Sequence, residues 1–229
     1  MDDRTLYELA QRRMTRIARQ LSDDQLAQEC PSCPGWSNQD VIAHHIHFLT
    51  GLIDDDVPAE MFQEITDTDA DERERAGKVR DDWTQAGVEA RRGRTLDALF
   101  AEWDERVAAM PAIIPTVDVV VHAGDVLESV GERRGLDTVL VDDTLMAYYE
   151  MTLASRVAAE GHAVTLVSTD TGSRIGAGVG AFEVRGTGND LLRALTGRRT
   201  RAEADATLDW GDTPRSIREA FPAYGWPER

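Results

Sequence analysis

The chain has 229 residues, of which 41% are hydrophobic, and a formal net charge of −17. This length suffices for one large domain or two smaller domains with apolar cores. No apolar run approaches the roughly 20 residues of a transmembrane helix, and the N-terminus resembles an amphipathic helix rather than a secretory signal. These two observations predict a cytoplasmic protein that does not act at a membrane. The acidic surface repels phosphate backbones, so nucleic-acid binding is not expected as the main function.

The first predicted helix spans residues 4–28, where apolar side chains recur every three or four positions. Two prolines and a glycine within residues 30–36 predict a turn after it. Ser37 then fits the N-cap of a second helix, with Asp40 in its first turn. His44 is therefore expected about two turns into a rigid element.

The middle of the chain has a weaker pattern. Between residues 51 and 93 acids and bases alternate, which predicts a connection with some helix. Periodic apolar residues predict a long helix over 95–110 and another over 116–131, with Thr116 as its N-cap. The β-branched residues of 116–131 suit a strand equally well, and that alternative stays open.

The character of the chain changes after the turn-rich stretch GERRGLD. A helix is predicted over residues 142–160, ending at Gly161. Strands are predicted in HAVTLVST, SRIGAG and AFEVRG, followed by a short helix in NDLLRALTG and a last strand in ATLDWG. This mixture indicates a small α+β domain. We therefore expect two domains, residues 1–138 and residues 139–229.

Three side chains in two separated segments fit a metal site: His44, Asp118 and His122. Residues four apart share a helix face, so Asp118 and His122 can bind one ion that His44 reaches from a neighbouring helix. Two imidazoles and a carboxylate leave one coordination position for water, a thiolate or a substrate oxygen. The alternative is a chance spacing with hydrogen-bonded core histidines, since this pattern is less specific than H-E-x-x-H.

The other histidines and one carboxylate need the same comparison. His45 points about 100° away from His44 around a helix, which indicates a packing or surface residue. His47 lies on nearly the same face as His44 and is at best a partner of a ligand. Asp125 can accept a hydrogen bond from a ligand imidazole, although a salt bridge or a solvated role is equally compatible. His162 is expected at the surface.

Cys30 and Cys33 form a C-x-x-C motif. A redox pair normally accompanies a βαβ pattern, and a zinc ribbon needs a second pair of cysteines. Neither is present in the sequence, so a structural or incidental role is favoured. Oxidation of the pair under stress remains open.

Three motifs in chain order match one family. SCPGWSNQDVIAHHIHFLTG resembles a signature, C-P-G-W-(S/T)-x-x-(D/E), that begins the second helix of that family. DVVVHAGDVLESVG resembles its E-x-x-x-H-x-x-D helix, and VRGTGNDLLRALTGRR resembles its C-terminal G-x-x-x-D-L-L-x-x-L-x-G-R element. The chain thus resembles the mycothiol-dependent maleylpyruvate isomerase family, a branch of the DinB-like metal-binding four-helix bundles. The resemblance touches nearly the whole chain.

The resemblance implies a two-domain α+β protein, with an N-terminal DinB-like four-helix bundle followed by a small sterol-carrier-like α+β domain. It implies a divalent metal, zinc being the expected ion, held by His44, Asp118 and His122, and mycothiol as a cofactor. The family most often has Glu where this chain has Asp118, so the shorter side chain must lie closer to the ion. Arg198 is the expected catalytic residue, because its planar fork suits a substrate carboxylate; satisfying a helix end is the alternative.

A bound divalent ion lowers the pKa of a thiol or water and polarises a carbonyl. We therefore expect a mycothiol-dependent isomerase or S-transferase that acts on a small electrophilic substrate. Two alternatives stay open: a non-catalytic module that binds a small molecule or a partner, and a metal-assisted hydrolase that needs no thiol. The sequence offers no serine with a paired histidine for covalent hydrolysis. It leaves the electrophile and the oligomeric state open.

Overall fold

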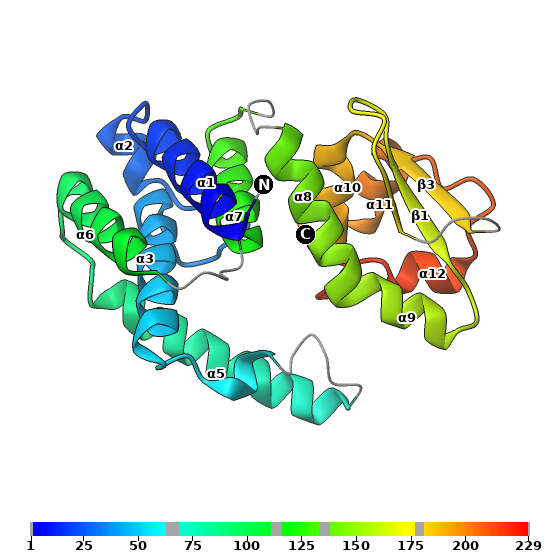
Figure 1. Ribbon diagram of the computed structural model, residues 1–229, viewed down its shortest axis with the longest axis horizontal. Coiled ribbons are helices and arrows are strands. Elements are labelled where there is room, and N and C mark those ends of the chain that lie inside the picture. The colour runs from blue at the N-terminus through cyan, green and yellow to red at the C-terminus, as the bar shows by residue number, and fades with distance from the viewer. Residues whose placement is uncertain (1, 63–68, 111–115, 133–137, 177–180, 229) are drawn as a thin grey trace. The chain divides into compact units, whose positions relative to one another are not determined.

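The computed structural model describes residues 2–62, 69–110, 116–132, 138–176 and 181–228. The chain divides into two compact units, Met1–Gly135 and Leu136–Arg229. The first unit is helical, and the second combines helices with a three-stranded sheet, so the expected α+β class is confirmed (Figure 1). The predicted domain boundary at residues 138/139 stays a prediction.

The described helices of the first unit surround α3 (Asn38–Asp54). Helix α3 packs against α5, α6 and α7, and α1 packs against α7 (Figure 1). The bounds of the other elements are α1 (Asp3–Ala18), α2 (Asp23–Ala27), the 3₁₀ turn η1 (Ala59–Phe62), α5 (Ala70–Glu89), α6 (Leu96–Ala109) and α7 (Val117–Ser129). Large buried side chains of this core include Met14, Ile42, Leu49, Leu99 and Trp103.

Helix α3 begins at the predicted cap. Ser37 Oγ accepts a hydrogen bond from the Asp40 amide at 3.1 Å, and Asp40 Oδ2 accepts one from the Ser37 amide at 3.0 Å. This capping box satisfies two amides that an uncapped helix leaves without partners, and such a cap contributes about 0.5–2 kcal/mol. The predicted turn before it closes through the Cys33 amide, which donates to the Cys30 carbonyl at 2.8 Å. The cap fixes where α3 begins and therefore where its histidines lie along the helix.

Two helices differ from their predictions. The helix predicted over 4–28 ends at Ala18, and Ser22 caps the separate helix α2 with a second capping box. The connection predicted between 51 and 93 contains the 20-residue helix α5. Charged residues cover most of α5, so its apolar contacts, Ala76 and Val88 among them, are too sparse to give a strong sequence signal.

Residues 117–129 form a helix, so the strand alternative is wrong for them. Val119, Val120 and Val121 are all buried. Packing on several sides of α7 therefore outweighs the β propensity of its valines. Thr116 precedes the helix as predicted, but its side chain makes no capping hydrogen bond.

A partly buried ion-pair network joins the residues that follow α5 to α6. Arg91 Nη2 lies 2.7 Å from Glu102 Oε1, and Arg94 pairs with the other oxygen of the same carboxylate. Burial of Glu102 would raise its pKa, but the hydrogen bonds and charges of Arg91 and Arg94 outweigh burial and lower the pKa below its usual range. The carboxylate therefore stays ionised and holds the two helices together.

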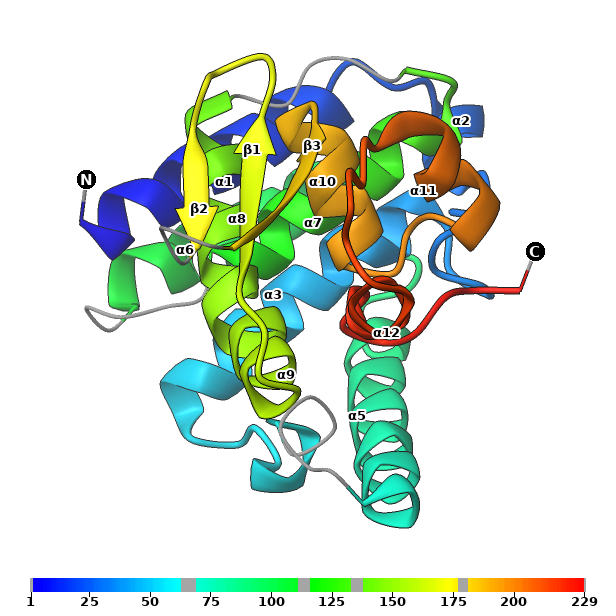
Figure 2. The same ribbon diagram turned by 90° about the vertical axis from the view of Figure 1, so that its right-hand side faces the viewer.

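The second unit contains a sheet in the order β2-β1-β3, formed by β1 (Val164–Ser168), β2 (Arg174–Gly176) and β3 (Phe182–Gly186). Strand β1 pairs antiparallel with β2 and parallel with β3 (Figure 2). Helices α8 (Thr138–Tyr148) and α10 (Gly188–Leu195) pack on this sheet. The remaining helical elements are the π-helical turn η2 (Tyr149–Leu153), α9 (Ala154–Ala159), α11 (Arg201–Thr207) and α12 (Arg215–Ala220).

The three predicted strands and the predicted helix in NDLLRALTG are confirmed over the described residues, outside which the last two residues of SRIGAG lie. Two other predictions for this unit are not confirmed. The helix predicted over 142–160 begins at Thr138 and is interrupted by η2 before it ends near Gly161. The strand predicted in ATLDWG is wrong, because α11 reaches Thr207 and Asp209 makes only an isolated bridge to Arg185. Among the described residues, no helix combines the length and apolarity needed to cross a bilayer.

Candidate metal centre

Two helices of the first unit bring the predicted ligands together. Helix α3 carries His44 and His45, and α7, which packs against it, carries Asp118 in its first turn and His122 one turn later. His44 Nε2 lies 3.2 Å from Asp118 Oδ2, and His122 Nε2 lies 3.5 Å from Asp118 Oδ1. Side chains from two segments, His44 and a pair that begins 74 residues later at Asp118, thus meet at one carboxylate.

A third imidazole belongs to the same cluster. His45 Nδ1 lies 3.2 Å from Asp118 Oδ2, and the side chain is 1% exposed. The donor atoms of His44, His45 and Asp118 all lie within 4.8 Å of one another. His45 was expected to be a packing or surface residue. It is buried, so the surface position is wrong, and its ring does pack, against Trp103.

The side chains of the cluster lie close together, but no hydrogen bond reaches the Asp118 oxygen between them. Asp118 Oδ2 is buried and accepts no hydrogen bond, although two imidazole nitrogens lie 3.2 Å from it. Both nitrogens of His45 and Nδ1 of His44 are also buried without a hydrogen bond. Each such orphan costs about 1–3 kcal/mol unless a further group satisfies it. The pattern fits donors that face a common point rather than one another.

The distances also fit a zinc-type ion. Zinc bonds of about 2.0–2.2 Å at tetrahedral angles hold neighbouring donor atoms roughly 3.3–3.6 Å apart. The measured separations of 3.2 and 3.5 Å lie close to that range. Asp118 therefore reaches the imidazoles despite being one methylene shorter than Glu, because α7 lies near enough to α3.

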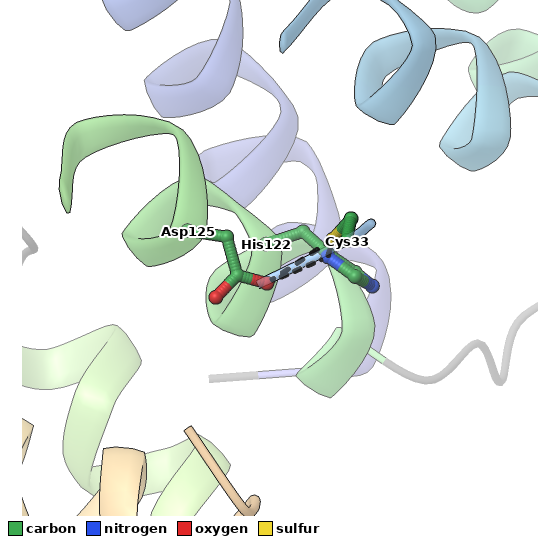
Figure 3. A group of neighbouring side chains, drawn as sticks. All are labelled: Cys33, His122 and Asp125. Atoms are coloured by element: carbon green, nitrogen blue, oxygen red, sulfur yellow. Dashed lines mark hydrogen bonds and ion pairs between the residues drawn. The ribbon is translucent and has the colours of Figure 1, made fainter. Parts of the chain in front are cut away.

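His122 makes contacts through both ring nitrogens, and Figure 3 shows those of Nδ1 with Asp125 and Cys33. Its Nδ1 lies 2.8 Å from Asp125 Oδ2 and 3.4 Å from Cys33 Sγ, while Nε2 faces Asp118. An ionised Asp125 could only accept a hydrogen bond, and Nδ1 would then carry the proton while the Nε2 lone pair faced the cluster. A carboxylate behind the imidazole is the usual outer partner of a metal-binding histidine. Asp125 lies where such a partner was expected.

Electrostatics favour a charged carboxylate and a neutral imidazole. Burial would raise the pKa of Asp118, but the neighbouring imidazoles of His122 and His44 outweigh it and hold the pKa well below its usual value. Burial lowers the pKa of His45 to about 4, against the opposing effect of Asp118. At neutral pH the cluster therefore offers an anionic oxygen and at least one imidazole with a lone pair.

Aromatic side chains surround the cluster. The His45 ring stacks on Trp103 at 5.8 Å between centroids, and Trp36 lies 5.1 Å from the His44 ring. Trp103 Nε1 donates to the Tyr7 hydroxyl at 3.2 Å. Burial raises the pKa of Tyr7, so its phenol stays protonated. These walls exclude water on the α6 side and lower the local dielectric, which strengthens charge interactions within the site.

The remaining sequence-selected residues lie elsewhere or play other parts. The His47 ring packs on Trp83 at 4.0 Å between centroids, on the side of α3 that faces α5. His162 is half-buried beside Phe182 in the second unit. Arg198 follows α10 in the same unit and donates to the Thr196 carbonyl at 2.8 Å. This contact corresponds to the alternative of satisfying a helix end.

Cys33, for which the sequence favoured a structural or incidental role within the C-x-x-C motif, lies beside a predicted ligand. Both Cys30 and Cys33 are buried thiols, and Cys33 Sγ contacts His122 and lies 3.8 Å from Asp125 Oδ2. Cys33, His122 and Asp125 form a second group of potential metal donors. The sequence signal was weak, because the contact depends on how the loop before α3 folds rather than on any helical spacing.

The fold and the cluster define a protein whose N-terminal helical unit presents a histidine- and carboxylate-rich candidate metal centre. The family model described as "Mycothiol maleylpyruvate isomerase N-terminal domain" matches residues 7–146, more than half of the chain. The chain belongs to this family.

Two solved structures are similar to the chain at 16% identity, each match covering 93% of both chains. One is a histidine-to-alanine mutant of the mycothiol-dependent maleylpyruvate isomerase, with a TM-score of 0.48. The other is the mycothiol-dependent maleylpyruvate isomerase, with a TM-score of 0.41. A comparison with curated proteins finds no match.

Proposed function

We propose that the protein is a metal-dependent enzyme that uses mycothiol to isomerise or conjugate a small electrophilic substrate. His44, Asp118 and His122 would hold a divalent ion, for which zinc is the expected identity. Family membership supports the thiol cofactor and the reaction class. The observation that carries the proposal is the convergence of imidazole nitrogens on the Asp118 carboxylate, whose buried Oδ2 accepts no hydrogen bond.

Donor chemistry supports zinc over the hard cations. Imidazole suits zinc, copper, iron and nickel, whereas magnesium and calcium prefer all-oxygen sites. A bound divalent ion supplies Lewis acidity, which favours the thiolate form of a thiol at neutral pH and polarises a carbonyl.

The chain's own residues would prepare the site for this chemistry. Asp125 holds the His122 ring with its Nε2 lone pair turned toward Asp118. Trp103 fixes the plane of the His45 ring and keeps that side of the site dry. A positioned donor set reduces the reorganisation that binding requires, because fewer side chains must be ordered when the ion arrives.

Arg198 remains the proposed residue for a carboxylate group on the substrate. The planar guanidinium suits bidentate recognition of such a group. Its hydrogen bond to the Thr196 carbonyl uses Nη1. An Arg198→Lys variant would keep the charge and lose the fork, so we expect a raised KM for anionic electrophiles and an unchanged metal content. A cytoplasmic location also stays a prediction.

The test is elemental analysis of protein purified without an affinity tag, followed by thiol-dependent assays. We expect roughly one zinc ion per chain in the wild type and a loss in His122→Ala. His47→Ala is the matched control, since it removes an imidazole from α3 outside the cluster. Equal metal content in His122→Ala and the wild type would exclude the ligand assignment.

The assay then separates the three reaction classes. Maleylpyruvate and a chloronitrobenzene are offered with mycothiol, with another thiol and without thiol. Turnover that requires mycothiol supports the proposal. Turnover without any thiol would favour metal-assisted hydrolysis, and metal binding without turnover of any electrophile would favour the non-catalytic module.

A further inference from the structure

His45 approaches the cluster as closely as the predicted ligand His44 does. Its Nδ1 lies 3.2 Å from Asp118 Oδ2, the same separation as that of His44 Nε2. The two residues are adjacent on α3, so their side chains leave the helix about 100° apart. Both rings nevertheless converge on one carboxylate, because Asp118 on α7 lies opposite the part of α3 between them.

The orientation of His45 distinguishes a donor to an ion from a hydrogen-bond donor to Asp118. An imidazole lone pair points along the direction that an N–H would take at the same nitrogen. Nδ1 lies near Asp118 Oδ2, yet its geometry makes no hydrogen bond to that oxygen. The nitrogen therefore points beside the oxygen rather than at it. Two atoms at this separation that do not face each other can both face a third atom.

Burial strengthens this interpretation. His45 is almost fully buried, and neither ring nitrogen has a hydrogen-bond partner among the described residues. A core histidine is normally satisfied by a carbonyl, a carboxylate or a water molecule. The Trp103 ring stacked on His45 offers only apolar contact on that side. An ion at the cluster would satisfy Nδ1 and remove part of this cost.

We propose that His45 Nδ1 is a fourth protein donor to the ion, so that three imidazoles and one carboxylate hold it. This inference rests on the proposed function, because it assumes that an ion binds at the cluster. It changes the expected chemistry of the site. With four protein donors, an incoming thiol needs a fifth coordination position or must displace one donor, whereas three donors would leave a position open.

The first test counts imidazole ligands in the unmodified protein. The zinc-loaded full-length chain is measured by extended X-ray absorption fine structure, in which outer-shell scattering reports the number of imidazoles. Three imidazoles per zinc are expected. Two imidazoles per zinc would overturn this inference while leaving the proposed function intact. Protein that binds no zinc would overturn both.

The second test replaces His45 and titrates the variant with Co²⁺, whose visible bands depend on coordination number and donor type. His45→Gln keeps most of the buried volume, and His45→Ala removes it. Loss of an outer partner of a ligand typically costs about 10–100-fold in metal affinity, so loss of a donor should cost roughly 100-fold or more. His47→Ala serves as the control on the same helix.

The result is interpreted on folded apoprotein only. Each variant is first compared with the wild type by circular dichroism and by thermal unfolding without metal. A raised Co²⁺ dissociation constant with an altered visible spectrum in His45→Gln supports the inference. An unchanged spectrum and dissociation constant in a folded His45→Gln variant would overturn it, and if neither variant folds, the imidazole count in the wild type decides.

Discussion

Replacing Asp125 by Asn tests whether the buried carboxylate behind His122 prepares that imidazole to bind an ion. Asp125 Oδ2 lies 2.8 Å from His122 Nδ1, and the Asp125 side chain is fully buried. Asn keeps the shape but loses the charge that fixes the proton on Nδ1. Substitutions of such outer partners typically lower metal affinity about 10–100-fold, which corresponds to roughly 1.4–2.7 kcal/mol.

The stability of the apoprotein should change less than its affinity. A neutral amide oxygen can still accept from His122, and exchanging a charge-assisted hydrogen bond for a neutral one costs about 1 kcal/mol. The assay is competitive zinc titration against a chromophoric chelator at constant pH, with urea unfolding of the metal-free protein alongside. Both measurements on one preparation separate ligand preparation from general loss of structure.

Asp104→Asn is the matched control, because Asp104 accepts a hydrogen bond from Gln11 Nε2 at 2.7 Å in the same bundle. It removes the charge of an exposed carboxylate that is hydrogen-bonded to buried Gln11, without touching the cluster, so its zinc affinity should equal that of the wild type. Wild-type affinity in Asp125→Asn would refute the reasoning. Equal losses in both variants would also refute it, since they would reflect the bundle as a whole.

The remaining predictions concern the carboxylate ligand and the packing of the bundle. Asp118→Glu should weaken zinc binding, because the oxygens already lie 3.2–3.5 Å from three imidazole nitrogens and a longer side chain must fold back; tighter binding in a zinc titration would contradict this. Glu102→Gln should destabilise the protein by about 1–3 kcal/mol near neutral pH, since it breaks the network with Arg91. The pKa of Glu102 is lowered in the folded state. The wild type should therefore have the larger free energy of unfolding at pH values above the unfolded-state pKa of Glu102, and its advantage over Glu102→Gln should shrink as the pH falls through the folded-state pKa. Urea unfolding of both proteins at a series of acidic pH values measures this. Gly87→Ala should lower the urea midpoint of unfolding, because the added Cβ would lie 2.0 Å from the His47 ring. Overpacking costs about 1–3 kcal/mol, which exceeds the gain in helix propensity of about 1 kcal/mol. A raised midpoint would contradict this and would show that the ring moves aside freely.

Local sequence signals predicted the parts of the site that depend on short-range geometry. Ser37 and Asp40 form a capping box whatever packs around them, so the start of α3 and the depth of His44 within it could be predicted. The spacing of four residues between Asp118 and His122 is likewise a property of any helix. Because residues 117–129 form a helix, Asp118 and His122 lie on the same face of it.

The parts that escaped prediction depend on neighbours that are distant in sequence. His45 was assigned to another face by the 100° rotation per residue, but α3 contacts α6 and α7 at once, so adjacent faces are both interior. Cys33 reaches His122 because the loop before α3 folds back through hydrogen bonds between Cys30, Cys33 and Trp36. Helix α5 is mostly charged, so its burial against α3 is not visible as a stripe.

The division of the donors between α3 and α7 couples the occupancy of the cluster to the folding of the bundle. Because the two helices are far apart in sequence, unfolding would separate the donors and release the ion, and thermodynamic linkage then ties the melting temperature to free zinc concentration. At a buffered zinc activity 100 times the dissociation constant, the bundle would gain about 2.7 kcal/mol. A cell's zinc supply would in this way set how much of the protein stays folded.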